Sequence, residues 1–155
     1  MTRILKCAAC LLALAATPAL ADPLVAIKAG EWVSTMQMGD GPPGSATALK
    51  ICYTADRTFS ESDLNRPLPG ADCHSTVTRS GQVLNIQTNC AIDKMQFTTN
   101  QVMTIVSDDE FAINSVTHIE NGPAKMPADM TMSIHWQHTG PCQPGDRPAP
   151  EPPKP

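Results

Sequence analysis

The sequence predicts an all-β fold: an antiparallel meander of about seven strands curled into a barrel or half-barrel, with one short helix and two disulfides. Three observations lead to this prediction. Several segments alternate apolar and polar residues with a period of two, as strands buried on one face do. Clusters of Gly, Pro, Asn and Asp separate these segments. Four cysteines follow the N-terminal segment at spacings that suit cross-links between strands.

Residues 73–90 are the clearest β-hairpin of the chain. Ser80-Gly81 is expected to form its two-residue turn, because β-forming residues flank it on both sides. With Arg79 paired to Gln82, Cys73 and Cys90 lie one diagonal step apart on the same face of the sheet. A small bend or bulge then brings the two thiols together, so the hairpin predicts a disulfide between them.

The cysteine count supports export. Cys7 and Cys10 fall in a segment expected to be removed, and an even number of cysteines in an exported domain usually forms a disulfide framework. Once the hairpin pair is assigned, Cys52 is left to pair with Cys142. A four-cysteine zinc site is an alternative interpretation, but the wide spacings lack the close cysteine pair typical of such sites.

Residues 1–21 are predicted to be a signal peptide that directs the chain to the periplasm. Arg3 and Lys6 give the positive start, residues 7–14 give a short apolar core, and Ala19-Leu20-Ala21 is a small-residue cleavage site. A retained anchor and lipidation at Cys10 are the alternatives. No later segment resembles a membrane span, and the net charge of −4 argues against nucleic acid and anionic membrane surfaces as partners.

Before the hairpin, Gly30–Met38 and Thr47–Tyr53 alternate as strands do. In the first strand, one face carries Trp32, Met36 and Met38. In the second strand, the apolar residues lie opposite Cys52, so a bridge from this cysteine is expected on the outer side or just beyond the strand end. Residues 54–64 are the one plausible helical piece, with Thr54 as its N-cap. Residues 22–29 are treated as a lead-in to the first strand.

A second hairpin and a last strand complete the predicted sheet. Burying both apolar faces of the hairpin together requires Ile105 to pair with Phe111 and Met103 with Ile113. The loop then has an odd number of residues, most simply 107–109. The last strand, residues 130–138, turns a second set of apolar side chains inward: Met130, Met132, Ile134 and Trp136.

The composition changes after Cys142. Residues 143–155 are rich in proline, carry scattered charge and have no apolar periodicity, so a disordered or polyproline II tail is expected. The domain organisation predicted from the sequence is therefore a signal peptide at 1–21, a single β-rich domain at 22–142 and a loose tail at 143–155.

Short motifs recur along the chain in a characteristic order. They are Gly30-Glu31-Trp32, Met36-Gln37-Met38, Cys52-Tyr53-Thr54, Cys73, Arg79-Ser80-Gly81, Cys90, Met130-Thr131-Met132 and Gly140-Pro141-Cys142. With these motifs the chain resembles the exported bacterial domain-of-unknown-function 3617 family, from about Gly30 to Cys142. The chain departs from the family pattern at Asp93-Lys94-Met95-Gln96, which lacks the expected glycines. The resemblance implies an exported β-rich domain and supplies no catalytic residues.

The residues themselves indicate no enzyme. The chain lacks a Gly-x-Ser-x-Gly nucleophile motif, and a hydrolase hypothesis finds no residues to carry it. His135 and His138, three apart on a strand, point to opposite faces and cannot share a metal ion. No cofactor is predicted.

The leading hypothesis is a non-enzymatic binding or interaction module, with a small apolar ligand or a protein as its partner. A filled core is the alternative interpretation of the same inward-facing residues. The candidate ligand-binding residues are Trp32, Met36, Met38, Phe97, Met103, Phe111, Met132 and Trp136. The alternative function is copper handling: thioethers of Met126, Met130 and Met132, joined by Met36 and Met38 and a histidine, are soft ligands for Cu(I).

Overall fold

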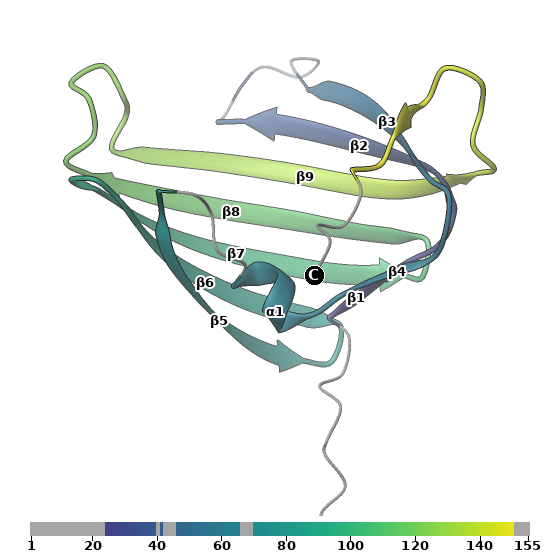
Figure 1. The fold of residues 1–155 in the computed structure, drawn as a ribbon, viewed down its shortest axis with the longest axis horizontal. Helices are drawn as coiled ribbons and strands as arrows, with labels where there is room; N and C mark the ends of the chain where they lie inside the picture. The colour runs from purple at the N-terminus through teal and green to yellow at the C-terminus, as the bar shows by residue number, and fades with distance from the viewer. Residues whose placement is uncertain (1–23, 40, 42–45, 66–69, 151–155) are drawn as a thin grey trace, which may run out of the picture.

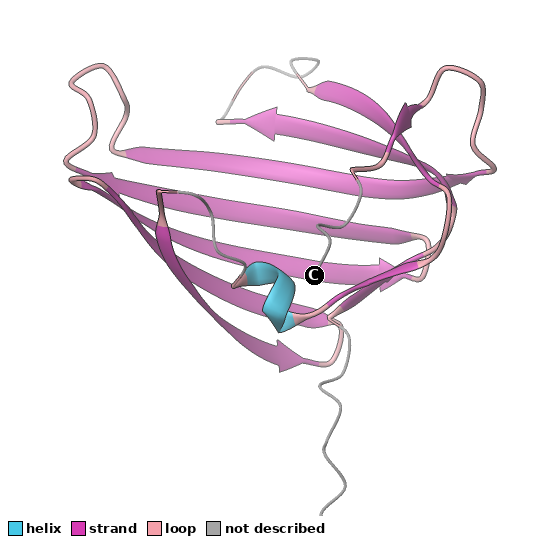
Figure 2. Ribbon diagram, viewed as in Figure 1, coloured by secondary structure: helices cyan, strands magenta, loops and turns pink. Residues whose placement is uncertain are grey.

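The computed structural model describes residues 24–39, 41, 46–65 and 70–150; the predicted signal peptide lies outside these ranges. Strands account for most of the described residues, which also contain one short helix (Figure 2). The elements are β1 Val25–Ile27, β2 Gly30–Met38, β3 Thr47–Tyr53, β4 Arg57–Phe59, α1 Glu61–Leu64, β5 Asp72–Ser80, β6 Val83–Ile92, β7 Met95–Ser107, β8 Glu110–Glu120, β9 Asp129–Gly140 and β10 Arg147–Pro148.

Eight strands form one large sheet in the order β10-β3-β2-β9-β8-β7-β6-β5, and β1 pairs with β4 in a separate two-stranded ribbon. All neighbours in the large sheet run antiparallel except β10 and β3, which are parallel. The predicted all-β, mostly antiparallel fold is therefore confirmed. The large sheet is strongly curved, but β10 and β5 remain as its edges, and the described strands form no closed barrel (Figure 1).

The concave face of the large sheet carries the apolar core. Along β9, the even-numbered side chains from Met130 to Trp136 are half-buried and the residues between them are exposed, as the period-two pattern predicted. In front of this face lie β1, β4 and α1, which together we call the cover (Figure 1). Apolar residues of the cover and of the sheet form a single cluster, so the core sits between these two layers.

The cover is where the structure differs most from the sequence prediction. The segment expected to be helical from Thr54 instead begins with β4, which pairs antiparallel with β1 in the expected lead-in. The helix is only four residues long, and Ser60, not Thr54, is its N-cap: the Ser60 amide donates to Asp63 Oδ2 at 2.8 Å. The β-forming Thr58 and Phe59 gain strand pairing that a single helical turn does not offer them.

The hairpin at residues 73–90 forms, with a register shifted from the prediction. Its turn residues are Gly81 and Gln82, and Ser80 pairs with Val83. Gly81 takes a φ of +60° at the first loop position, where a type II′ turn requires glycine. Cys73 then lies directly opposite Cys90, with a Cα–Cα distance of 4.1 Å, and the predicted disulfide needs no diagonal step.

The second hairpin has the predicted pairing, Ile105 with Phe111 and Met103 with Ile113. Its loop differs from the prediction, because Ser107 pairs with Glu110 and the register shifts between Ile105 and Ser107. A bulge therefore supplies the extra residue that keeps both apolar sets on one face.

The residues placed by the sequence in a loose tail contain β10. Arg147 pairs with Ile51 of β3, and the Ala149 amide donates to the Cys52 carbonyl at 2.8 Å. The Cys52–Cys142 disulfide, with a Cα–Cα distance of 5.3 Å, joins the same two segments and confirms the second predicted pairing. Residues 151–155 lie outside the described ranges.

Among the residues that the structure covers, no helix has the length and apolar character needed to span a bilayer.

Candidate functional site

An apolar pocket of about 220 Å³ lies between the cover and the concave face of the sheet. None of the side chains around it is charged. The lining residues are Leu24, Val25, Ile27, Tyr53, Phe59, Leu64, Leu84, Ile86, Gln101, Met103, Phe111, Ile113 and Trp136. An apolar space of this kind with few polar groups is the usual form of a small-ligand site.

The cover contributes one wall of the pocket through strand alternation. Val25 and Ile27 of β1 are buried and Ala26 between them is exposed, so both apolar side chains point toward the sheet. The Leu24 amide donates to the Phe59 carbonyl at 2.7 Å and holds the start of β1 on β4. These short strands position Leu24, Val25 and Ile27 over the pocket.

The sheet contributes the opposite wall through rows of directly paired residues. Leu84 of β6, Met103 of β7 and Ile113 of β8 form one such row across three neighbouring strands. In the next row Phe111 faces Trp136 of β9, and their rings stack with centroids 5.8 Å apart. Because paired residues of a sheet share a face, these side chains converge on one surface.

Three lining residues carry polar side-chain groups: Gln101, Tyr53 and Trp136, whose indole N–H is a donor. Gln101 of β7 contributes an amide between Ile86 and Ser115, its partners in the register. Tyr53 contributes a phenol, and burial raises the pKa of that phenol, although the nearby Arg57 guanidinium, 5.3 Å from the ring centroid, opposes the shift. The phenol therefore stays protonated at neutral pH and acts as an uncharged hydrogen-bonding group.

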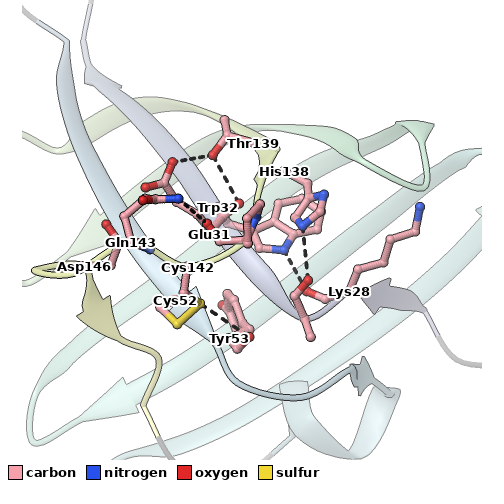
Figure 3. Close-up of a disulfide and its surroundings, with 12 residues drawn as sticks. Lys28, Glu31, Trp32, Cys52, Tyr53, His138, Thr139, Cys142, Gln143 and Asp146 are labelled. Carbon is pink, nitrogen blue, oxygen red and sulfur yellow. Dashed lines mark hydrogen bonds between the residues drawn. A yellow bond between two sulfur atoms is a disulfide. The ribbon is translucent and has the colours of Figure 1, made fainter.

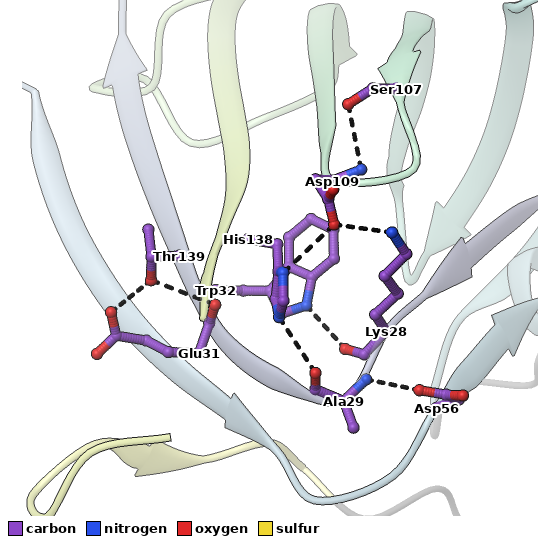
Figure 4. A network of polar contacts seen from close by, with 9 residues as sticks. All are labelled: Lys28, Ala29, Glu31, Trp32, Asp56, Ser107, Asp109, His138 and Thr139. Carbon is purple, nitrogen blue, oxygen red and sulfur yellow. Dashed lines mark hydrogen bonds and ion pairs between the residues drawn. The ribbon is translucent and has the colours of Figure 1, made fainter. Parts of the chain in front are cut away.

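A polar network fixes the cover to the sheet at the start of β2 (Figure 4). Lys28 Nζ lies 3.0 Å from Asp109 Oδ1, and the same carboxylate lies 3.3 Å from His138 Nδ1. His138 Nε2 is 3.1 Å from the Ala29 carbonyl oxygen, and the Ala29 amide donates to Asp56 at 2.7 Å. The hydrogen bond with Asp109 raises the pKa of Lys28 and lowers that of Asp109, so both groups are charged at neutral pH.

A second network lies beside the Cys52–Cys142 disulfide (Figure 3). Thr139 Oγ1 donates to the buried Glu31 carboxylate, and Lys50 Nζ lies 3.0 Å from Glu31 Oε2. The Thr139 hydrogen bond, followed by that of Lys50, lowers the pKa of the Glu31 carboxyl. This network is on the face of β2 opposite Trp32 and supports the sheet rather than the pocket.

The structure brings only part of the predicted ligand-binding set to the pocket. Met103, Phe111 and Trp136 line it, and the fully buried Trp32 packs its ring at a tilt against that of Phe111, with centroids 5.7 Å apart, from behind the lining. Phe97 does not line it, because it pairs with Cys90 and Ile119 toward the other end of the concave face.

The remaining three predicted residues gather at the far end of β2. Met38 pairs directly with Met132, and Met36 pairs with Ile134. Met36 and Met38 are 38% and 62% exposed, because the cover does not extend over this end of the concave face. We call Met36, Met38, Met130 and Met132 the methionine patch.

Sequence reasoning missed the wall that the cover supplies. Leu24, Val25 and Ile27 were assigned to a lead-in, although a run of apolar residues before Gly30 was the available signal. The two histidines lie on opposite faces of β9, as predicted: exposed His135 pairs with Glu110, whereas His138 pairs with Asp109. Within the described ranges, no three His, Cys, Asp or Glu side chains gather as a metal site would require.

The fold and pocket define a disulfide-bonded, all-β domain with an open, curved sheet and an apolar space under a small cover. The chain belongs to the family described as "Protein of unknown function (DUF3617)", which matches residues 27–142. This range starts at Ile27 of the cover and ends at Cys142, so it contains both disulfides. Comparison with curated proteins finds no match, and comparison with solved structures finds none either.

Proposed function

We propose that this protein is a non-enzymatic binding module whose apolar pocket holds a small apolar ligand. The observation that carries the proposal is the space of about 220 Å³ lined by uncharged, mostly aliphatic and aromatic side chains. A dry cavity of about 150 Å³ lined by similar residues is large enough to bind benzene. The atoms that line an empty space lack dispersion contacts on one side, and a bound ligand would supply these contacts to both walls.

We further propose that the curved sheet acts as a half-barrel and the cover as its lid. The cover is held by short strands and by the network around Asp109, whereas the sheet has continuous ladders. Opening of the cover would therefore cost less free energy than opening of the sheet. This difference gives a ligand a route into the pocket.

The proposal places the protein in the periplasm, after removal of residues 1–21. Two disulfides per domain support an oxidising compartment, because thiols stay reduced in the cytosol. The predicted signal peptide supports the same location.

A ligand-dependent melting experiment tests the pocket. Benzene should raise the Tm of the wild-type protein, because a ligand that binds only the folded state stabilises it by mass action. Ile113→Phe fills the pocket from β8 and should abolish the shift. Val116→Phe is the matched control, since Val116 lies on the same strand but is exposed on the other face. A wild-type Tm that does not respond to benzene would contradict the proposal.

Copper handling is the second candidate, and the methionine patch favours it. Met38 and Met132 face each other directly, and Met36 and Met130 lie on the same face beside them. Thioethers select Cu(I) among metal ions. Anaerobic titration with Cu(I) should show one ion bound to the wild type and none to the double variant M38L/M132L. Met103→Leu, in the pocket, is the control that should bind copper normally. Equal copper binding by all three proteins would show that the methionine patch is not the copper site.

A further inference from the structure

Gln101 and Tyr53 carry the two side-chain groups of the pocket that can both donate and accept a hydrogen bond, whereas Trp136 adds only an indole donor. Both residues belong to the lining of the apolar space, and within the described residues neither the Gln101 amide nor the Tyr53 hydroxyl makes a hydrogen bond. No described buried polar atom is fully enclosed without a partner, so both groups keep some solvent-accessible surface. Unpaired polar groups in an otherwise apolar site usually fix the orientation of a ligand.

The polar side chains nearest to Gln101 already make hydrogen bonds within the protein. Ser115, directly opposite Gln101, donates to the Met132 carbonyl at 3.4 Å. In the adjacent row, Thr99 and Thr117 share a hydrogen bond of 3.0 Å between their hydroxyl groups. Gln101 is therefore the residue of this wall whose side chain can both donate a hydrogen bond to a ligand and accept one, whereas the indole of Trp136 can only donate.

The pocket provides no counter-charge. None of its lining residues is ionised at neutral pH, and the nearby Arg57 lies over the Tyr53 ring and donates to the Pro150 carbonyl. An ionised head group entering this space would lose its hydration without gaining an ion pair, which is costly. An uncharged alcohol or amide would lose less and would gain hydrogen bonds with the amide and the phenol.

We propose that the pocket takes an uncharged amphiphile, with its apolar body against Leu84, Met103 and Ile113 and an alcohol or amide head group at Gln101. This inference rests on the proposed binding function and specifies its ligand class. Gln101 is a binding residue that selects the head group, and Tyr53 offers a second hydrogen-bonding position on the opposite wall.

A series of probes with the same tail tests the head group. Binding of 1-octanol, octanamide, sodium octanoate and octylammonium is measured by titration calorimetry at neutral pH. The wild type should bind the two neutral probes at least about tenfold more tightly than either ion, because burying an unpaired charge costs more than burying a dipole.

Variants of Gln101 assign the selection to that side chain. Gln101→Leu should weaken octanamide binding about fivefold, which corresponds to one net hydrogen bond. Asn100→Leu is the matched control, because Asn100 is the preceding residue of β7 and faces the opposite side of the sheet. Tyr53→Phe removes the Tyr53 hydroxyl with little change of shape, and it provides the test if Gln101→Leu does not fold.

The outcomes separate the two proposals. If neither benzene nor any octyl probe binds, the pocket function itself is wrong. If benzene binds but octanoate binds as tightly as octanol, the inference about an uncharged head group is overturned and the pocket function stands. Unchanged octanamide affinity in both Gln101→Leu and Tyr53→Phe would also overturn the inference.

Discussion

The indole nitrogen of Trp32 donates a hydrogen bond to the carbonyl oxygen of Lys28 at 2.9 Å. This bond joins the fully buried side chain of β2 to the turn that leads out of the cover. The ring of the same side chain contacts those of Phe111 and His138, with centroids 5.7 and 5.4 Å away. Trp32 therefore couples the position of the cover to the packing behind the pocket.

Trp32→Phe should destabilise the protein by about 2 kcal/mol. The smaller ring leaves a cavity, and the Lys28 carbonyl loses its donor. Urea unfolding monitored by circular dichroism measures the change. Trp136→Phe, a half-buried aromatic on β9 with no hydrogen bond of its own among the described residues, is the comparison and should cost less. Equal losses for both variants would contradict the coupling assigned to Trp32.

The sequence specified the long strands well. The bounds of β2 and β3 and the pairing of Ile105 with Phe111 follow from alternation, because a one-residue slip would expose an entire apolar face. The predicted hairpin turn was wrong by one residue, because glycine suits more than one position and type of two-residue turn. In the structure Gly81, with a φ of +60°, occupies the first loop position.

The candidate site was harder to predict, for a physical reason. The strands of the cover, Val25–Ile27 and Arg57–Phe59, have three residues each and are too short to show a period. The two strands pair although they lie far apart in the sequence, so neither segment helps to predict the other. The sequence therefore indicated which residues of the sheet face inward, but its one signal for the opposite wall was the short apolar run before Gly30.

Gly30→Ala should destabilise the protein by more than about 2 kcal/mol. A Cβ at this position would overlap the Gly140 carbonyl oxygen and His138 Nε2, and the φ of +131° is itself strained for alanine. Gly39→Ala is the matched control at the other end of β2, where a Cβ meets nothing within 4 Å. Thermal unfolding compares the two variants. A smaller loss for Gly30→Ala than for Gly39→Ala would be inconsistent with the close approach of β2 and β9.

The stability contributed by His118 should depend on pH. Its hydrogen bond with Asp129, 2.8 Å long, raises the pKa of His118 above the ordinary value of 6.5. The folded state therefore favours the protonated ring, and the stabilisation is complete below that value and lost as the pH rises through the raised pKa. His118→Gln should lower the Tm near about pH 5 and have a smaller effect near about pH 9. A larger loss of Tm at the higher pH than at the lower pH would show that the ion pair between His118 and Asp129 does not stabilise the protein.

Loss of either disulfide should lower the free energy of unfolding, and the loss should be larger for Cys52–Cys142, which closes the longer loop. The chain-entropy treatment gives about 3 kcal/mol for Cys73–Cys90 and about 4–5 kcal/mol for Cys52–Cys142, whose sequence separations are 17 and 90. The double variants C73A/C90A and C52A/C142A, compared by urea unfolding, test this order. Alkylation of all four thiols in unreduced protein would show instead that the bridges do not form.

The pocket between the cover and the sheet is the central claim, and methyl NMR during titration with 1-octanol tests it most directly. The account predicts saturable shifts at the methyl groups of Ile27, Ile86 and Ile113, which line both walls, and none at the exposed Val102 and Val116 on the other face. Shifts confined to Val102 and Val116, or no saturable shift at any methyl group, would contradict it.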